Sequence, residues 1–353
     1  MVVPRTPSQT PLRVPFDNSC HICILGAGGL GSLIGGWLAE SGARVTLVAR
    51  PAQVGVIRSR GLEISGIRGH HTIRRGLEAV ATPDPVRGPI DALVLCVKAR
   101  DTALALEMAD ALRDETRLVF SVQNSIEKED ALCAWIGAER VIGASTTEAG
   151  TLEAPGRVRH VATAPTAFYF GELDGSTSSR VAALVDVFNK AGFASQQTSE
   201  IRHVEWEKLL QIAVLAGWSV STTGMMPGGS VAEALVVREA AEHYVAIARE
   251  LLDVYRALGY EPRDFFHPFS RFRDLSRLGF EDAVASMQEQ GQRMLDQGIV
   301  GRPSLHVDLL RAKPTEVEQC LLPFLVEAER RGIAVPTARA AYRIIRTLER
   351  MSS

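Results

Sequence analysis

The sequence predicts an α/β protein of two domains, in which a parallel-sheet domain is followed by an all-helical C-terminal domain. Between residues 20 and 199, short apolar runs alternate with helical segments, a pattern typical of parallel sheets covered by helices. From residue 200 to the end, long helical periods dominate and strand patterns are nearly absent. We therefore expect a leader over residues 1–19, a sheet domain over 20–199 and a helical domain over 200–353.

Composition narrows the classes of protein. The 353 residues are enough for two hydrophobic cores. Lys plus Arg (39) nearly balances Asp plus Glu (41) without a long block of either sign, so neither nucleic acid nor an anionic membrane is indicated as a partner. No apolar run reaches the roughly 18 residues of a spanning helix. The oligomeric state is left open, with a homodimer as the simplest assembly.

The N-terminus and the cysteines bear on location. Residues 1–19 contain four prolines and no apolar segment of a signal peptide, so we expect a disordered leader. The five cysteines are scattered, and the close pair Cys20 and Cys23 precedes a strand without a histidine set that would complete a zinc site. Free thiols fit a reducing cytoplasm.

A glycine-rich turn joins the first predicted strand, residues 21–25, to a predicted helix that ends near Gly42. A second strand follows over residues 44–50. The turn reads Gly26-Ala27-Gly28-Gly29-Leu30-Gly31. In this context the pattern predicts a Rossmann-type dinucleotide-binding turn, in which Gly26 permits the sharp bend, Gly28 admits a pyrophosphate and Gly31 lets the helix pack closely. Amides at the helix N-terminus would hold the phosphate charge.

The end of the second strand selects the form of the dinucleotide. An NAD site offers an acidic residue there for the ribose 2′-hydroxyl group. This chain has Arg50, followed by Pro51, and no acidic residue before Glu63. A cationic side chain suits a 2′-phosphate, so the sequence favours NADPH. The alternative is an arginine that is simply solvated at a strand end.

Polar residues follow two later strands. The strand over residues 92–97 ends at Lys98, and the strand over 117–122 ends at Gln123 and Asn124. Ligands of parallel sheets collect at the carboxyl ends of the strands, so we expect both clusters to face the nicotinamide half of the cofactor. The alternative is a surface lysine and a loop asparagine without a ligand. The rest of the sheet domain is predicted as strands over 141–146, 158–163 and 166–172, a helix over 179–191 and a closing segment over 193–199.

The helical half begins with a segment in which a lysine stands among apolar residues. Helices are predicted over 203–220, 230–258, 281–297, 303–312, 316–331 and 337–350. In the first of them, Ile212 and Ala216 lie four and eight residues after Lys208 and share its face. Shielding from water would lower the pKa of Lys208 and make it a proton donor near neutral pH. A lysine in a first helical turn also often extends to solvent, so both interpretations stay open.

Acidic and hydroxyl residues cluster near residue 310. Ser304 and Asp308 lie one helical turn apart, and Thr315 with Glu318 fits a capping box. Glu316 would be favoured in a first helical turn by the helix dipole alone. Its functional alternative is a carboxylate that pairs with Lys208 across the cleft between the two domains, where ligands commonly bind.

Taken together, these segments resemble the ketopantoate reductase (2-dehydropantoate 2-reductase) family. The similar segments are GAGGLGSLIGGWLAESG, VKARDT, the QNS turn, the WEK triplet, SLHVD, PTE and the closing VPT at 335–337. The resemblance covers about residues 20 to 350. It implies reduction of a 2-keto acid to a 2-hydroxy acid by NADPH in the cleft, and a place in pantothenate biosynthesis if ketopantoate is the substrate.

The resemblance also assigns roles to the catalytic candidates. It implies that Lys208 protonates the carbonyl oxygen as hydride arrives and that Glu316 helps to orient the reactants. Ser304 matches the serine that binds one end of the substrate, with Asp308 beside it. A cationic donor would stabilise the negative charge that hydride addition builds on the oxygen.

Further matches concern the cofactor. Arg50 and Lys98 match the residues that hold the adenosine 2′-phosphate. Asn124 matches the asparagine of the family's Gln-Asn-Gly turn, and with Gln123 and Glu316 it completes the expected set of cofactor contacts.

The chain departs from the family around the substrate. Ile212 and Ala216 stand where the family usually has asparagines, Ser125 replaces the turn glycine, and Leu321 and Glu318 replace an asparagine and an aspartate. Missing hydrogen-bonding partners reduce selectivity for a small polar substrate by orders of magnitude. We therefore expect a more apolar pocket and a bulkier or less hydroxylated keto compound, with ketopantoate still a candidate.

Three other classes were weighed. Two-domain opine or hydroxyacid dehydrogenases run in the oxidative direction, but Arg50, the WEK triplet and the PTE segment argue against them. An inactive nucleotide-binding protein would explain the missing asparagines, although Lys208 and Glu316 are retained. A metalloenzyme is poorly supported because the eight histidines are dispersed and the adjacent pair His70-His71 lies in a polar turn.

Overall fold

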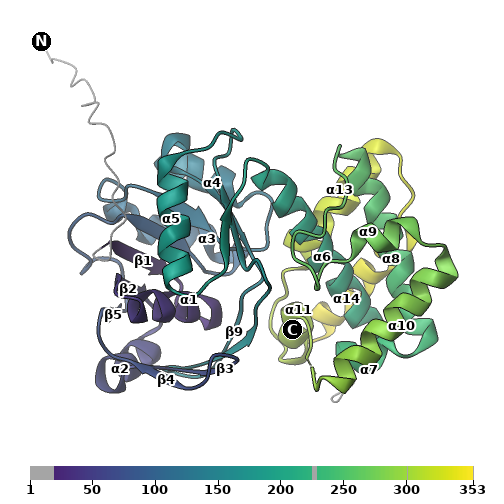
Figure 1. The fold of residues 1–353 in the computed structure, drawn as a ribbon, viewed down its shortest axis with the longest axis horizontal. Coiled ribbons are helices and arrows are strands. Elements are labelled where there is room, and N and C mark those ends of the chain that lie inside the picture. Colours follow the sequence, from purple (N-terminus) through teal and green to yellow (C-terminus); the bar gives the residue numbers. More distant parts are fainter. Residues whose placement is uncertain (1–19, 225–228, 300, 353) are drawn as a thin grey trace, which may run out of the picture.

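Two domains lie side by side in the computed structural model, which describes residues 20–224, 229–299 and 301–352. Figure 1 shows the sheet domain in purple to teal and the helical domain in green to yellow. The chain passes from β12 (Ser195–Gln197) of the first domain to α6 (Ile201–Thr223) of the second. This architecture confirms the predicted fold class. The predicted leader over residues 1–19 lies outside the described residues.

A five-stranded parallel sheet forms the centre of the first domain. Its strands are β1 (His21–Leu25), β2 (Arg44–Val48), β5 (Leu77–Val80), β6 (Ala92–Leu95) and β7 (Val119–Ser121). They run in the order β5-β2-β1-β6-β7, and Ile22 on the middle strand is in register with Val45 on one side and Ala92 on the other. All residues of β1 are buried, as expected for a continuous apolar run covered on both faces.

Two smaller sheets complete this domain. One has the order β4-β3-β10-β9 and the other β12-β11-β8. Their remaining strands are β3 (Leu62–Gly66), β4 (His71–Ile73), β8 (Gly143–Thr146), β9 (Ala149–Ala154), β10 (Arg157–Ala162) and β11 (Phe168–Gly171). The helices of the domain are α1 (Gly29–Glu40), α2 (Pro51–Arg60), α3 (Thr102–Met108), α4 (Lys128–Ile136) and α5 (Ser179–Lys190).

Helix α1 is packed between two of these sheets, and two adjacent glycines make this possible. A β-carbon at Gly35 would lie 2.5 Å from the Leu47 side chain of β2, and one at Gly36 would lie 2.6 Å from the Ile64 side chain of β3. A larger residue at either position would force the neighbouring side chains to shift, because buried side chains are already close-packed. The close packing fixes where the N-terminus of α1 lies.

The helical domain is built around α6. The other helices are α7 (Val231–Leu235), α8 (Arg238–Ala257), α9 (Phe272–Arg277), α10 (Phe280–Asp296), α11 (Ser304–Leu310), α12 (Val317–Cys320), α13 (Leu322–Arg331) and α14 (Pro336–Ser352). Helix α6 is buried on most sides, and Trp218 near its end donates from Nε1 to the carbonyl of Ala240 in α8 at 2.7 Å. A helix that is apolar nearly all round is the expected centre of such a domain.

Several boundaries differ from the sequence prediction. The helix predicted over 230–258 is two helices, α7 and α8, because Val237 takes an extended conformation between them. The helix predicted over 316–331 is likewise divided into α12 and α13. The prediction missed β3, β4, β5, β9, α2, α3, α4 and α9. These elements have between three and ten residues, so they are too short to show a long apolar period.

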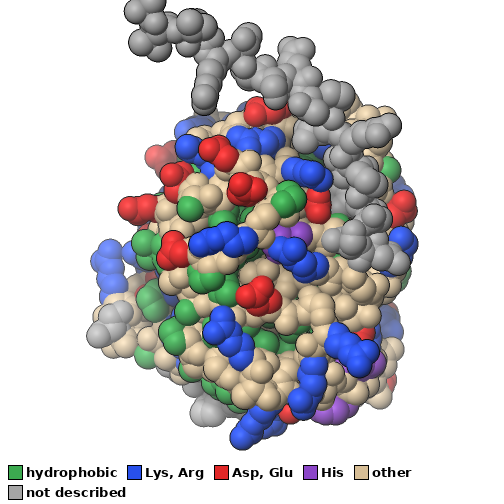
Figure 2. Space-filling view, turned by 90° about the vertical axis from the view of Figure 1, so that its left-hand side faces the viewer, with side chains coloured by type: hydrophobic (Ala, Val, Ile, Leu, Met, Phe, Trp, Pro, Cys, Tyr) green, Lys and Arg blue, Asp and Glu red, His purple; other side chains and the backbone are tan. Residues whose placement is uncertain are grey.

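The surface shown in Figure 2 belongs to the outer side of the sheet domain. Acidic and basic side chains of the described residues are interspersed there, which agrees with the near balance of charges in the sequence. Within residues 20–224, 229–299 and 301–352, none of the helices is both long enough and apolar enough to cross a membrane.

Candidate active site

The glycine turn lies between β1 and α1, at the carboxyl end of the central sheet. Gly26 has a φ of +97°, which favours glycine strongly. Its amide and that of Ala27 both donate to the carbonyl of Val48 at the end of β2, at 3.1 and 3.0 Å. A β-carbon at Gly26 would also lie 2.6 Å from the Val97 side chain. The turn is therefore held against both neighbouring strands.

The other glycines of the turn differ in what surrounds them. A β-carbon at Gly28 would meet no atom within 4 Å, so the backbone there borders open space that a ligand can approach. At Gly31 it would lie 2.4 Å from the Gly26 carbonyl, and at Gly29 it would lie 2.1 Å from the Gly150 carbonyl on β9. Leu30 packs against the core. Gly28 thus faces a ligand space, whereas Gly29 and Gly31 allow close packing.

Arg50 lies directly after β2 and precedes the first residue of α2. Its side chain is exposed, and it forms no ion pair with an acidic residue in the described part of the chain. Since β1 and β2 are adjacent and parallel, Arg50 lies on the same edge of the sheet as the glycine turn. The residues present therefore fit a dinucleotide: an open backbone position at a helix N-terminus for a diphosphate, and a free cation nearby.

Lys98 and Glu316 form the main ionic contact between the domains near this edge. The Nζ atom of Lys98 lies 2.7 Å from Oε2 of Glu316 and 3.1 Å from Oδ2 of Asp308. The Ala99 amide donates to Oε1 of Glu316 at 3.0 Å. Burial lowers the pKa of Lys98, but the two carboxylates more than offset it, so the net pKa is raised and the lysine stays cationic.

This contact corrects one expectation, since Glu316 pairs with Lys98 and not with Lys208. The capping box was also wrong. The first residue of α12 is Val317, preceded by Glu316 without a side-chain cap. The Thr315 hydroxyl instead donates to Glu349 of α14 and accepts from the Val317 amide at 3.3 Å. The Thr315 hydroxyl therefore accepts from an amide two residues on, and its own proton is used in a charge-assisted hydrogen bond to the Glu349 carboxylate.

Lys208 lies in the second turn of α6 with a neutral partner. Its Nζ donates to Oε1 of Gln211 at 3.3 Å and lies 5.4 Å from the centre of the Phe266 ring. It forms no ion pair with a carboxylate among the described residues. Burial lowers the pKa of Lys208 to about 8, as expected for an ammonium group shielded from water. The amine is therefore poised to release a proton near neutral pH.

The turn after β7 links the two parts of the site. The Gln123 side chain donates to the Val97 carbonyl at 2.9 Å and to the Thr102 hydroxyl at 2.8 Å, so it joins the ends of β7 and β6. Ile126, three residues on, is buried among the α6 and α8 side chains of the helical core. Asn124 lies between these anchors, half-buried, and its side chain makes no hydrogen bond within the described residues. Its amide is available to a ligand.

The remaining predicted site residues lie in different environments. Ser304 is the exposed first residue of α11, one turn before Asp308. Ile212 is half-buried on the same face of α6 as Lys208, whereas Ala216 is buried in the helical core with an exposed fraction of 1%. Ile212 can therefore border a ligand beside Lys208. Ala216 lies deeper in the core and offers no hydrogen-bonding group to a ligand.

The sequence analysis missed two polar residues that flank Lys208. Glu207 is fully buried, and its carboxylate accepts from the amides of Arg263 and Phe265 at 2.7 and 2.8 Å. Gln211 donates from Nε2 to the Phe269 carbonyl at 3.2 Å. Buried polar groups on an apolar helix need partners, and the four-residue spacing of Glu207 and Gln211 places them on one face. That spacing was the available indication.

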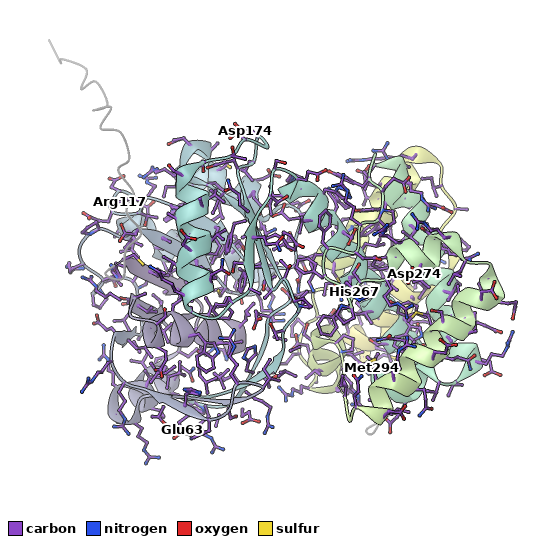
Figure 3. The ribbon with its side chains drawn as sticks, viewed as in Figure 1. Glu63, Arg117, Asp174, His267, Asp274 and Met294 are labelled. Carbon is purple, nitrogen blue, oxygen red and sulfur yellow. The ribbon has the colours of Figure 1, made fainter. Side chains whose placement is uncertain are left out.

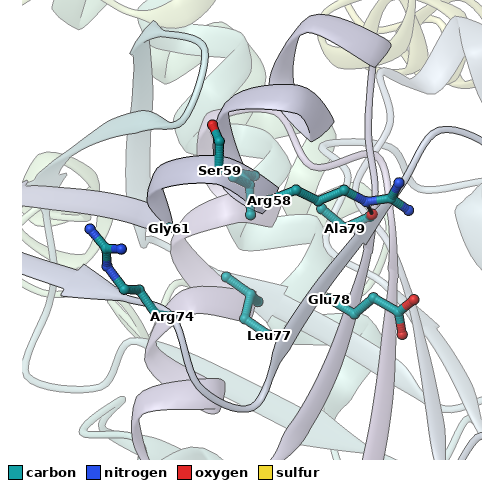
Figure 4. Close-up of a pocket in the computed structure, with 8 residues that line it drawn as sticks. Arg58, Ser59, Gly61, Arg74, Leu77, Glu78 and Ala79 are labelled. Atoms are coloured by element: carbon teal, nitrogen blue, oxygen red, sulfur yellow. Dashed lines mark hydrogen bonds between the residues drawn. The ribbon is translucent and has the colours of Figure 1, made fainter.

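Two hollows of the surface lie away from the predicted site residues. One of about 370 Å³ lies between the end of α2 and β5, where Arg58 donates to the Ala79 carbonyl at 2.8 Å. Figure 4 shows Arg58 and Arg74 extending to opposite sides of it. It contains none of the predicted site residues. A second hollow, of about 470 Å³, adjoins the start of α6 and is lined by Glu172, Leu173, Ser199, Glu200, Ile201, Arg202, His203, Gly259, Tyr260, Glu261 and Arg263.

No group of three or more His, Cys, Asp or Glu side chains suited to a metal ion occurs among residues 20–224, 229–299 and 301–352. Cys23 is fully buried in β1, and burial raises the pKa of its thiol to about 12. No disulfide joins the cysteines of this part of the chain.

Comparisons with known proteins identify the same family in both halves of the chain. A model of the family "Ketopantoate reductase PanE/ApbA" matches residues 22–175, and a model of its C-terminal part matches residues 200–349. The 2-dehydropantoate 2-reductase of Archaeoglobus fulgidus is 27% identical over 330 residues, which are 93% of this chain and 98% of the relative.

Solved structures show the same arrangement. A PanE/ApbA family ketopantoate reductase from Ralstonia eutropha has a TM-score of 0.75 and 25% identity, and the match covers 94% of this chain and 99% of that one. A D-mandelate dehydrogenase with NADH and anilino(oxo)acetate has a TM-score of 0.73 and 20% identity, with coverage of 94% and 99%. At that identity the second match shows the fold alone.

Proposed function

The chain belongs to the ketopantoate reductase family, and from this premise we propose that it reduces a 2-keto acid to a 2-hydroxy acid with NADPH. Relatives with the name 2-dehydropantoate 2-reductase, matched over nearly their whole length, support an oxidoreductase that acts on a carbonyl group. The observation that supports this chemistry most directly is Lys208, whose pKa is lowered by burial to about 8 and which has no acidic partner among the described residues.

The dinucleotide would be held at the carboxyl edge of the central sheet. It supplies the hydride when bound. Gly28 leaves room for its diphosphate, and Arg50 is the free cation for a 2′-phosphate. Lys98 was expected to share that role, but it lies between the carboxylates of Asp308 and Glu316. Two carboxylates repel a phosphate, so we assign the 2′-phosphate contact to Arg50 and an interdomain contact to Lys98.

Lys208 would act as the general acid. As the carbon of the keto group accepts hydride, negative charge develops on its oxygen, and the ammonium group of Lys208 stabilises that charge and transfers a proton to it. The products are the 2-hydroxy acid, the oxidised dinucleotide and a neutral amine. Glu316 holds the end of β6 through Lys98 and the Ala99 amide, so its role is to position the cofactor edge against the helical domain.

The substrate's carboxylate and side chain have separate candidate contacts. Asn124 offers an amide without a partner among the described residues, and Ser304 offers an exposed hydroxyl at the start of α11. Ile212 and Ala216 provide apolar surface where hydrogen-bonding groups would select a hydroxylated substrate. We therefore propose a keto acid that is bulkier or less hydroxylated than ketopantoate, while ketopantoate stays in the tested set.

The test is oxidation of NADPH and of NADH, followed at 340 nm, with a panel of 2-keto acids that includes ketopantoate. We expect turnover with at least one keto acid and a preference for NADPH. A protein that binds NADPH but oxidises it with no member of the panel would be a nucleotide-binding protein without this activity. That alternative is favoured by one observation, the apolar residues at positions 212, 216 and 321.

A further inference from the structure

An aromatic segment, residues 263–271, lies against the proton donor. It runs between α8 and α9 and contains Phe265, Phe266 and Phe269. Phe266 is fully buried, whereas the tip formed by His267, Pro268 and Phe269 is exposed. Figure 3 places His267 on the side of the helical domain that faces the sheet domain. We call residues 263–271 the aromatic loop.

The aromatic loop is fixed to the turn of α6 that contains Lys208. The buried carboxylate of Glu207, one residue before Lys208, accepts from the Arg263 and Phe265 amides and from the Ser270 hydroxyl at 2.7, 2.8 and 3.1 Å. These bonds hold both ends of the loop. A buried carboxylate with three donors is a strong local anchor, so the exposed tip stands on a rigid base.

Two further contacts connect the loop to Lys208 itself. The Phe266 ring lies 5.4 Å from the Lys208 Nζ, within the range of a cation–π interaction. The Gln211 side chain bridges the Lys208 Nζ and the Phe269 carbonyl, at 3.3 and 3.2 Å. A substrate whose keto oxygen reaches the Lys208 amine must therefore lie beside Phe266 and close to the backbone of Phe269.

The loop also contacts the sheet domain. The Tyr169 hydroxyl on β11 donates to the Phe265 carbonyl at 2.9 Å, and its ring packs edge-on against Phe266 with centroids 5.3 Å apart. The aromatic loop therefore connects the turn of α6 that contains Lys208 to a strand of the sheet domain. Phe269 has an exposed fraction of 42%, so its ring can be reached by a ligand.

From this geometry we infer that the aromatic loop forms the side of the substrate site that determines specificity, and that it selects 2-keto acids with an aryl side chain. The inference rests on the proposed keto-acid reductase function. A phenyl group attached to the keto carbon would pack against Phe269, on the tip beside the proton donor, where aromatic rings attract each other in offset or edge-on arrangements. Ile212, four residues after Lys208 on the same face of α6, offers no hydrogen-bonding group, so a hydroxylated side chain placed against it would lose its bonds to water.

The inference predicts a specific order of substrates. We expect kcat/KM with phenylglyoxylate to exceed that with 2-oxobutanoate by at least about tenfold, because a buried phenyl ring adds both apolar area and ring contacts. Ketopantoate, which has a hydroxyl group on its side chain, should fall below phenylglyoxylate. An order with ketopantoate first would overturn the inference and leave the reductase function intact, whereas turnover of no keto acid would remove the reductase function itself.

Substitution of Phe269 tests whether this side chain produces the preference for an aryl substrate. Phe269→Ala should lower kcat/KM for phenylglyoxylate about tenfold and change that for 2-oxobutanoate less than about twofold. Phe269→Tyr, which keeps the ring, should restore most of the preference. Phe280→Ala is the matched control, since Phe280 is similarly exposed, at 38%, but lies at the start of α10 against Arg249. It should leave the preference unchanged.

Two results would contradict this assignment. If Phe269→Ala lowered kcat/KM for both substrates equally, the loop would serve only to support Lys208. If Phe269→Ala and Phe280→Ala both left the ratio of the two kcat/KM values at its original level, the aromatic loop would not determine substrate specificity. Thermal unfolding of each variant, expected to be cooperative and within a few degrees of the parent protein, shows that the folded protein is being compared.

Discussion

At the scale of single residues, the pKa of Lys208 determines how the reaction should depend on pH. Burial lowers this pKa from 10.5 to about 8. In the proposed mechanism reduction requires the protonated amine, so kcat/KM for keto-acid reduction should be level below about pH 8 and fall about tenfold per pH unit above it. Oxidation of the hydroxy acid requires the neutral amine and should rise up to the same pH. A pH–rate profile in both directions measures this, and a break near 10.5 would contradict the burial of the amine.

A second prediction at this scale separates Arg50 from Lys98. Arg50→Ala should raise KM for NADPH about tenfold or more and leave KM for NADH nearly unchanged, because one phosphate contact is lost. Lys98→Met should weaken both dinucleotides to a similar degree, since its carboxylate partners belong to the helical domain. Initial rates with each dinucleotide distinguish the two. A selective loss of affinity for NADPH in Lys98→Met would show that Lys98 contacts the phosphate.

The same residues show what a sequence can and cannot predict. The glycine turn was predictable because its function depends on residues close together in the chain, and Gly26 has the positive φ that the pattern requires. The partner of Glu316 was not predictable in this way, because Lys98 lies 218 residues earlier in the chain. Choosing between Lys98 and Lys208 requires the position of one domain against the other, which no local spacing encodes.

At the scale of elements, the contact of α1 with β9 gives a paired prediction. Gly29→Ala should destabilise the protein by about 1–3 kcal/mol, because its β-carbon would lie 2.1 Å from the Gly150 carbonyl. Gly28→Ala is the matched control: its β-carbon meets nothing within 4 Å, so stability should hold while dinucleotide affinity falls. Chemical denaturation and dinucleotide titration of both variants measure this. Equal stability of the two variants would mean that the helix does not lie against β9.

A buried group of charges joins α4 to α6. Lys128 lies 2.7 Å from Glu205 and 3.0 Å from Glu129, and Arg202 lies 2.9 Å from Glu129. Lys128, Glu129 and Glu205 are almost fully buried, and burial raises the pKa of Glu129 despite the nearby lysine. The charges balance, but each depends on the others. The group connects the helix after Asn124 to the helix that contains Lys208.

Removing one charged side chain from this group should therefore lower the free energy of unfolding. Lys128→Met would leave two buried carboxylates with reduced compensation and should destabilise the protein by about 3–5 kcal/mol. The double variant Lys128→Met with Glu205→Gln should recover part of this loss, because it removes a charge of each sign. Equilibrium unfolding in urea measures both. A single variant as stable as the parent protein would show that water reaches these side chains in solution.

Element boundaries were harder to predict than element types. The strong apolar periods of α6 and α10 were recognised close to their observed ends, whereas β9, with the sequence AGTLEA and largely exposed, was missed. Its position depends on the pairing with β10 and on Gly150 against α1. Those are contacts between distant segments, and they override the weak local preference of a short polar strand.

At the scale of the whole molecule, the proposed function requires that the two domains meet at one place. The sheet domain contributes the glycine turn, Arg50 and Asn124, and the helical domain contributes Lys208, Glu316 and the aromatic loop. Lys98 to Glu316 and Tyr169 to Phe265 are contacts that cross the junction. The sequence predicted the two domains and their order, but it placed neither these contacts nor the loop, since both arise only when the domains are packed together.

The central claim is that the Lys208 amine supplies the proton when the keto acid accepts hydride. Stopped-flow oxidation of enzyme-bound NADPH by the best keto acid of the panel, compared between the parent protein and Lys208→Met, tests it most directly. We predict unchanged NADPH binding, seen in nucleotide fluorescence, and a hydride-transfer rate about 10²–10⁴-fold lower in the variant. An unchanged rate of hydride transfer in Lys208→Met would contradict the account.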